Sequence, residues 1–217
     1  MDELITKVLS YVEDYMSRYD ASHDYEHILR VYYLARTISA REAHLLPSVH
    51  YNSNVIALAS LLHDVGDKKY LMPGEDGSTM VQKILLNFNT PTSLAEEVQQ
   101  IVSHVSYSTE IKDPSKIKNT ITEHPELAVV QDADRLDAMG AVGIGRCFAY
   151  TAAKGKGSLQ EAIIHFQEKL EKLESMMKTR TGRAMAVERA ERLRVFRGWW
   201  DEEVHEGWEG WEGKESQ

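Results

Sequence analysis

Residues 54–67, NVIALASLLHDVGD, contain the most informative pattern in the sequence. Apolar residues cover nearly every side of a helix in this stretch, so the predicted helix should be central and buried. His63 and Asp64 follow these apolar residues, and Gly66 is well placed to end the helix. Burying an imidazole beside a carboxylate costs free energy unless a partner such as a cation pairs with both. The alternative is that Asp64 caps a loop while His63 donates to a backbone carbonyl.

Helical periodicity also dominates the sequence on both sides of this stretch. Before it, apolar residues recur on one face of residues 2–19, and a second helix begins after Ser22 or Asp24 and ends before Pro47. No sustained strand alternation is present, so we predict an all-α fold. Later helices are predicted over residues 80–88, 91–104, 126–137, 140–154, 159–178 and 182–204.

The length and spacing of these segments predict a single-domain helical bundle. We place this domain at residues 1–205 and an acidic, mobile tail at residues 206–217. Residues 108–125 carry charges, Pro114 and Pro125 without clear periodicity, which predicts a long connection. An active-site flap is one interpretation of that connection.

Composition and charge argue against nucleic acids and membranes as binding partners. The chain has 217 residues and a formal net charge of −9, which repels nucleic-acid backbones and acidic membranes. Cys147 is the only cysteine, which excludes an intramolecular disulfide and a multi-cysteine zinc site. No apolar run approaches the roughly 18 residues that span a bilayer. We therefore expect a cytoplasmic or nuclear protein with a small-molecule partner, and no long nucleic acid or membrane.

A second candidate ligand for a cation lies in the predicted helix that follows Asp24. His27 shares the inward face of that helix with Val31 and Leu34. For a single inward histidine, a buried side chain satisfied by one hydrogen bond is the commoner explanation. The presence of His63 and Asp64 elsewhere in the chain makes a shared metal site the stronger hypothesis.

A third segment, LAVVQDADRLDAMGAVG at residues 127–143, supplies clustered carboxylates. Asp132, Asp134 and Asp137 lie within six positions, and we expect Asp132 and Asp137 to cap helices or pair with Arg135. Asp134 then completes a set of two histidines and two aspartates. Such a set suits manganese, iron, cobalt, zinc or magnesium, whereas its histidines argue against calcium.

The order of these residues resembles the H…HD…D signature of the HD-domain metal-dependent phosphohydrolase superfamily. The residues that carry this likeness lie in HDYEHILRVYYLA (23–35), ASLLHDVGD (59–67) and VVQDADRLDAMGAVGIGR (129–146). The stretches HFQEKLEKLESMMKT (165–179) and AVERAERL (186–193) look like the last helices of one subgroup. That subgroup lies near bacterial nucleoside-triphosphate pyrophosphohydrolase-like members and their fungal counterparts. The resemblance covers roughly residues 20–200 and implies a helical HD-domain bundle.

The resemblance also implies a catalytic metal site with His27, His63, Asp64 and Asp134 as ligands. It predicts one divalent ion, with manganese favoured for activity, and open positions for water and a substrate oxygen. Asp64 would therefore serve both as a ligand and in catalysis. Asp67 lies three residues beyond it, close enough to exchange a proton with the attacking water. Its alternative role is to hold the turn after Gly66.

Six further residues are predicted substrate contacts. His23 precedes His27 by one helical turn and is placed at the entrance of the site, and each of the six has an alternative role as a capping, solvated or paired group. The six are Lys68, His23, His104, Arg146, Lys169 and Arg189.

The predicted reaction is hydrolysis of a phosphate ester or anhydride in a small, nucleotide-like substrate. Release of pyrophosphate from a nucleoside triphosphate is one form of it. Two alternatives remain open at this stage: a di-iron HD-type oxygenase, which needs a second metal, and a non-catalytic, metal-binding regulatory protein. The protein is expected to be a monomer or a homodimer.

Overall fold

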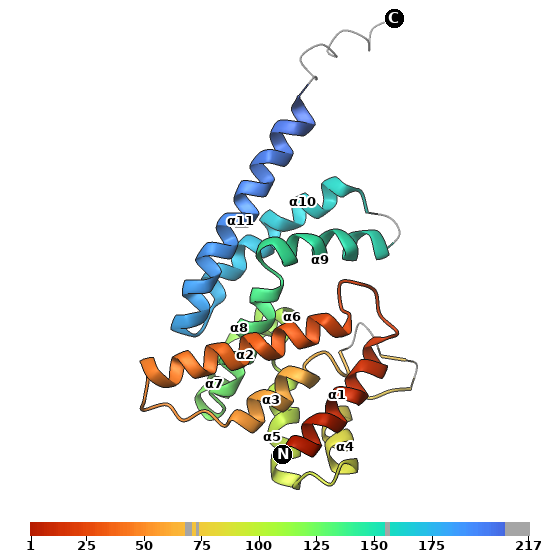
Figure 1. Ribbon diagram of the computed structural model, residues 1–217, viewed down its shortest axis with the longest axis vertical. Coiled ribbons are helices and arrows are strands. Elements are labelled where there is room, and N and C mark those ends of the chain that lie inside the picture. The colour runs from red at the N-terminus through yellow and green to blue at the C-terminus, as the bar shows by residue number, and fades with distance from the viewer. Residues whose placement is uncertain (68–70, 73, 155–156, 207–217) are drawn as a thin grey trace, which may run out of the picture.

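The computed structural model describes residues 1–67, 71–72, 74–154 and 157–206. Within these ranges the fold is all-α and contains no strand, as predicted (Figure 1). The elements are α1 (Asp2–Met16), α2 (Tyr25–Leu45), α3 (Ser53–Leu62), α4 (Met80–Asn87), α5 (Thr92–Val102), α6 (Tyr107–Lys112), α7 (Pro114–Glu123), α8 (Glu126–Asp137), α9 (Gly140–Ala153), α10 (Leu159–Glu168), the 3-10 helix η1 (Leu170–Met176) and α11 (Arg180–His205).

Two clusters of buried apolar side chains stabilise the bundle. The first joins α1, α4 and α5 to one side of α3, and the second joins α9, α10, η1 and α11 to one side of α2 (Figure 1). Burial of this apolar surface is the main favourable contribution to folding.

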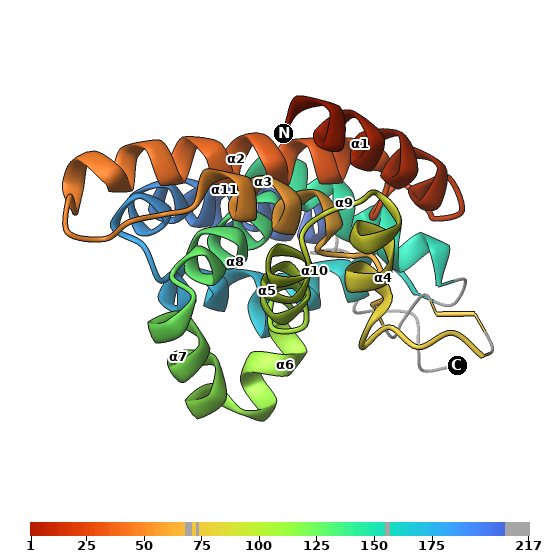
Figure 2. The same ribbon diagram turned by 90° about the horizontal axis from the view of Figure 1, so that it is seen from below.

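Helices α2, α3 and α8 contribute to both clusters. In α2, Ile28 belongs to the first cluster and Val31 to the second; in α8, Val130 belongs to the first and Val129 to the second. Helix α2 packs across α3 and α8 (Figure 2). Because these three helices are packed on more than one side, side chains at their junction are held in fixed positions.

The start of α2 is fixed by a side-chain cap. Asp24 is the N-cap residue, and its Oδ1 accepts a hydrogen bond of 2.8 Å from the backbone N–H of His27. Of the two predicted caps, the structure thus selects Asp24. An N-cap side chain satisfies a backbone donor that the helix itself cannot pair. The cap therefore defines the backbone position of His27.

The prediction of a long connection over residues 108–125 is wrong. This segment forms α6 and α7, which meet at Asp113. The side chain of Ser106 caps α6, and Asp113 caps α7 directly before Pro114 at its first position. These capping residues and the proline are ordinary start signals for helices that are too short to show clear periodicity.

The predicted helix over residues 159–178 is also divided. Helix α10 ends at Glu168, Lys169 leaves the helical region with φ −133° and ψ −57°, and η1 follows. The proposed domain boundary at residue 205 coincides with the end of α11, but residues 207–217 lie outside the described part of the chain. Among the described helices, none has the length and apolarity needed to cross a membrane.

Candidate metal centre

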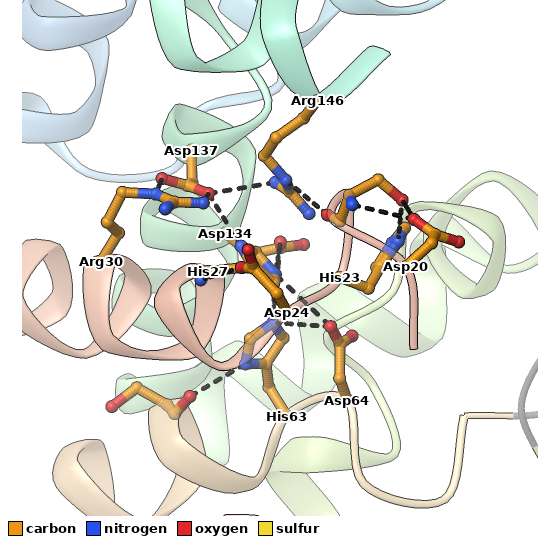
Figure 3. A network of polar contacts seen from close by, with 12 residues as sticks. Asp20, His23, Asp24, His27, Arg30, His63, Asp64, Asp134, Asp137 and Arg146 are labelled. Atoms are coloured by element: carbon orange, nitrogen blue, oxygen red, sulfur yellow. Dashed lines mark hydrogen bonds and ion pairs between the residues drawn. The ribbon is translucent and has the colours of Figure 1, made fainter. Parts of the chain in front are cut away.

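Two histidine rings from different helices meet at the junction of α2, α3 and α8. The Nε2 atoms of His27 and His63 lie 3.2 Å apart, and both residues are buried (Figure 3). The Nδ1 atom of His63 lies 2.8 Å from the carbonyl oxygen of Ser60, and only a protonated nitrogen can donate to a carbonyl. A neutral His63 therefore directs the lone pair of its Nε2 toward His27.

Two carboxylates complete this cluster. Asp64 Oδ2 lies 3.4 Å from His27 Nε2 and 3.6 Å from His63 Nε2. Asp134 Oδ1, from α8, lies 3.6 Å and 3.7 Å from the same two nitrogens. The ligand atoms of His27, His63 and Asp64 all lie within 4.8 Å of one another. The three sequence segments thus bring all four predicted ligands together (Figure 3).

The cluster carries concentrated, opposite charges. Burial opposes the charged form of His63, but the carboxylates of Asp64 and Asp134 outweigh it and raise its pKa to about 9. Burial likewise opposes ionisation of the two aspartates, yet the neighbouring histidines hold the pKa of each carboxyl well below its ordinary value. The carboxylates therefore stay ionised and create a site that attracts positive charge.

The donor set fits a divalent cation. Asp64 Oδ2 is buried and has no hydrogen-bond partner, which is costly unless a cation binds it. Metal–ligand bonds of about 2.0–2.2 Å place adjacent ligand atoms roughly 3.0–3.5 Å apart. The 3.2 Å separation of the two imidazole nitrogens, and the 3.4 Å separation of His27 from Asp64, agree with that spacing.

Comparison with known families places this geometry in context. The sequence model of the HD domain family matches residues 24–139. This range begins at the cap of α2 and ends just after α8. The chain belongs to the HD domain family. HD domains bind divalent metals, and the matched range contains all four residues of the cluster.

Similar proteins extend the likeness beyond residues 24–139 to most of the chain. The chain is 33% identical over 190 residues to YpgQ of Bacillus subtilis strain 168, a match that covers 84% of this chain and 85% of YpgQ. The crystal structure of Bacillus subtilis YpgQ in complex with ADP has a TM-score of 0.73 at 30% identity and covers 93% and 95% of the two chains. An HD-superfamily hydrolase from Bacillus thuringiensis has a TM-score of 0.68 at 29% identity and covers 94% and 98%.

The loop that carries Asp64 and Asp67 is held by one contact to α1 and by a hydrogen bond within its own turn. Gly66 adopts φ +81°, a conformation that favours glycine, and its N–H donates to the hydroxyl of Tyr15 at 3.2 Å. The backbone N–H of Asp67 donates to the carbonyl of Asp64 at 3.3 Å. This turn sets Asp67 close to the predicted ligand Asp64, and its proposed proton transfer stays a prediction.

His23 lies at the same end of α2 as the cluster (Figure 3). Its Nδ1 lies 2.7 Å from the hydroxyl of Ser22, and its ring stands 6.0 Å from the rings of both His27 and Tyr150. Burial, together with the positive charge of Arg146, lowers the pKa of His23 to about 4 despite the nearby aspartates. His23 is therefore neutral at neutral pH, and its substrate contact stays a prediction.

The other predicted substrate contacts have partners away from the four ligands. His104 is buried and its Nδ1 lies 2.7 Å from the carbonyl of Gln100. Lys169 lies over the ring of Tyr107 at 5.0 Å, and Arg189 donates to the carbonyl of Leu136 near the end of α8. Their roles toward substrate stay predictions, and Lys68 lies outside the described residues.

Asp137 was expected to cap a helix or pair with Arg135, and this expectation is wrong. Its carboxylate accepts hydrogen bonds from Arg30 and Arg146 and contacts His27 Nδ1 at 2.8 Å (Figure 3). Arg146, predicted as a phosphate contact, is thus engaged with Asp137. The sequence did hold one signal, since Arg30 follows His27 by three positions and shares its helix face.

The expectation that Asp132 caps a helix is wrong, because the N-cap residue of α11 is Thr179, whose side chain accepts from the N–H of Gly182. Asp132 is instead fully buried and accepts hydrogen bonds from the backbone N–H groups of Lys178 and Thr179 and from the Thr179 hydroxyl, at 2.7 to 3.1 Å. These contacts fix the start of α11 against α8. Asp132 and Asp137 therefore face different partners from one helix, and Asp137 alone of the two reaches a predicted ligand.

Proposed function

We propose that this HD domain is a metal-dependent phosphohydrolase that cleaves a phosphate ester or anhydride in a nucleotide. One divalent cation, with manganese the first to test, is held by His27, His63, Asp64 and Asp134. The proposal combines the geometry of the cluster, the match to the HD family and the similarity to an HD-superfamily hydrolase.

The observation that carries the proposal is the convergence of four metal-binding side chains at one buried point. The Nε2 atoms of His27 and His63 approach each other at 3.2 Å, and Asp64 Oδ2 is buried beside them without a hydrogen-bond partner. Ionised carboxylates gathered in this way require positive charge beside them, and the raised pKa of His63 reflects that requirement. A divalent cation meets that requirement with ligands of the right type.

A cation bound there supplies positive charge that polarises a phosphoryl oxygen and eases deprotonation of a water molecule. The protein's own residues orient the reactants. Asp134 is partly exposed, with 28% of its side chain accessible, so the site opens toward solvent on that side. Asp67 follows the ligand turn and is the proposed group that accepts the proton of the attacking water and returns it to the leaving oxygen.

The nucleotide is proposed from similarity and from the surroundings of the cluster. YpgQ, which shares this fold, was crystallised with ADP. His23 lies between the cluster and Tyr150, and the ammonium of Lys154 lies 4.3 Å from the centre of the Tyr150 ring. Neutral His23 supplies a polar contact for substrate, while the cation offsets the charge of the phosphates.

Product analysis tests the reaction and its finer form. The purified chain is incubated with a panel of nucleoside mono-, di- and triphosphates, with Mn²⁺ or with EDTA, and the phosphate and pyrophosphate released are measured separately. We expect turnover in the presence of Mn²⁺ and none in the presence of EDTA. We also expect at least one nucleoside triphosphate to release pyrophosphate and a nucleoside monophosphate. Release of inorganic phosphate instead of pyrophosphate would support the proposed phosphohydrolase activity but exclude pyrophosphohydrolysis.

Two variants separate this activity from contamination. Asp64→Ala removes a proposed ligand and should abolish turnover, whereas Asp14→Ala changes an exposed residue of α1 and should leave it intact. Equal turnover by Asp64→Ala and the unmodified protein would contradict the proposal. Two irons per chain with oxygen consumption would favour the oxygenase, and metal binding without turnover of any substrate would favour the regulatory alternative.

A further inference from the structure

The carboxylate of Asp137 is the centre of a buried polar network beside the metal site. Asp137 is 1% exposed, and its Oδ2 lies 2.8 Å from His27 Nδ1. Arg30 donates to Oδ1 through Nε at 2.8 Å and to Oδ2 through Nη2 at 3.2 Å. Arg146 donates to Oδ2 through Nη1 at 3.1 Å. Figure 3 shows these groups converging on one side of the His27 ring.

This arrangement decides which nitrogen of His27 carries the proton. An ionised carboxylate only accepts hydrogen bonds, and two guanidinium groups favour the ionised form of Asp137. His27 Nδ1 must therefore donate to it. In the neutral ring the Nε2 atom then has a lone pair, and this is the atom that faces His63, Asp64 and Asp134.

His63 reaches the same state by a different contact. Its Nδ1 donates to the carbonyl oxygen of Ser60, one turn earlier in the chain, so its tautomer is set by local backbone. The tautomer of His27 is set by a side chain 110 residues away. Only the second contact can be removed by substitution without altering the backbone of the ligand loop.

We propose, on the basis of the proposed metal centre, that Asp137 is a positioning residue that fixes the orientation and tautomer of His27 for metal binding. Arg30 and Arg146 hold the carboxylate in place. A carboxylate that accepts from the second nitrogen of a metal-binding histidine fixes the ring and strengthens it as a ligand. The predicted phosphate contact Arg146 thereby gains a structural role, because its Nε also donates to the Ser22 carbonyl at 2.7 Å.

The test compares Mn²⁺ binding by the full chain and by three variants, measured by titration calorimetry. Asp137→Ala should weaken binding about 10- to 100-fold, the usual effect of losing such a partner. Asp137→Asn should have an intermediate effect, because its amide oxygen can accept from His27 while its NH₂ group then opposes the Nε donor of Arg30. Asp132→Asn alters a second buried aspartate of α8 and should leave Mn²⁺ affinity unchanged.

Nitrogen NMR of the histidine rings in metal-free protein gives a second, independent readout. In the unmodified protein the neutral form of His27 should show a protonated Nδ1 and an unprotonated Nε2. Asp137→Ala should shift the ring toward the other tautomer, while Asp132→Asn should not. A general loss of stability would not produce that difference between the two variants.

The outcomes separate this inference from the proposed function. Unchanged Mn²⁺ affinity in Asp137→Ala, or an unchanged His27 tautomer, would overturn the positioning role while leaving the hydrolase proposal in place. If the unmodified chain itself failed to bind Mn²⁺, the proposed function would fail. The nitrogen spectrum would then still decide whether Asp137 sets the tautomer, since that measurement needs no metal. If Asp137→Ala does not fold, Asp137→Leu carries both measurements, because its side chain is closer in size to Asp and has no acceptor for His27 Nδ1.

Discussion

Gly77 packs against the backbone of Gly66 so closely that a β-carbon at Gly77 would lie 2.1 Å from the Gly66 carbonyl oxygen. Gly66 belongs to the turn that follows His63 and Asp64. The contact therefore joins the segment before α4 to the loop that carries a proposed metal ligand. Because both partners are backbone, neither can move aside as a flexible side chain would.

Gly77→Ala should consequently displace the ligand loop. We expect a loss of about 1–3 kcal/mol in the free energy of unfolding, the usual cost of forcing extra atoms into a packed site, together with weaker Mn²⁺ binding. Urea denaturation and calorimetric titration measure the two effects. Gly198→Ala is the control, because a β-carbon at that position would meet no atom within 4 Å apart from the neighbouring backbone of its own helix. Unchanged stability in Gly77→Ala would show that the approach of the two segments is not required.

Removing the cap of α2 should affect the metal site as well as stability. Asp24→Ala should cost about 1 kcal/mol and loosen the first turn, which carries His27, so Mn²⁺ binding should weaken. Asp113→Ala removes the equivalent cap of α7, where Asp113 Oδ1 accepts from the N–H of Lys116 at 3.0 Å. It should lower stability by a similar amount with no effect on Mn²⁺. Equal affinities in both variants would contradict the link between the cap and the site.

A buried ion network between α6, α8 and the start of α11 should make stability depend on pH. Glu110 contacts Arg135 at 2.5 Å and Lys178 at 2.6 Å, and Arg135 is 2% exposed. Burial opposes ionisation of Glu110, but Lys178 and Arg135 outweigh it and lower its pKa. The stabilisation is therefore present above the unfolded pKa of about 4.5 and is lost as pH falls through the lower folded value.

Glu110→Gln should reveal this contribution. At pH 7 it leaves the buried Arg135 without its carboxylate and should cost about 3 kcal/mol, the lower end for breaking a buried pair. The difference from the unmodified protein should shrink below about pH 4.5. Urea denaturation at several pH values measures it. A difference that stayed constant with pH would exclude the ionised Glu110 as its source.

Cys147 should react slowly with thiol reagents in the folded protein. It is 7% exposed, its Sγ contacts the carbonyl of Ala162, and burial raises its pKa to about 11. The thiolate is the reactive form, so a disulfide reagent at pH 8 should label the native chain slowly and the urea-unfolded chain at once. Because Cys147 is the only cysteine, the change in absorbance of the reagent gives the rate at which Cys147 is labelled. Fast labelling of native protein would contradict its burial.

The sequence predicts the helices at the centre of the bundle well because their apolar residues repeat over several turns. Helices α2, α3 and α8 are of this kind, and their ends place His27, His63, Asp64 and Asp134 where the structure brings them together. The identity of these residues follows from their order in three segments. Their proposed roles in binding and catalysis stay predictions.

The features that were not predicted are short helices and contacts between residues far apart in the sequence. Helices α6 and α7 contain six and ten residues, too few for periodicity to outweigh their charges and Pro114. The role of Asp137 depends on Arg30, 107 positions away, and on Arg146 of another helix. Local propensity contains no information about such a pair, because only the packing of α2, α8 and α9 brings it together.

The position of a bound ion tests the central claim most directly. A crystal soaked in Mn²⁺ and measured near the manganese absorption edge would locate the ion by its anomalous signal. We predict one peak per chain, about 2.0–2.3 Å from His27 Nε2, His63 Nε2, Asp64 Oδ2 and Asp134 Oδ1. No peak at this position, or a peak that these four side chains do not share, would contradict the account.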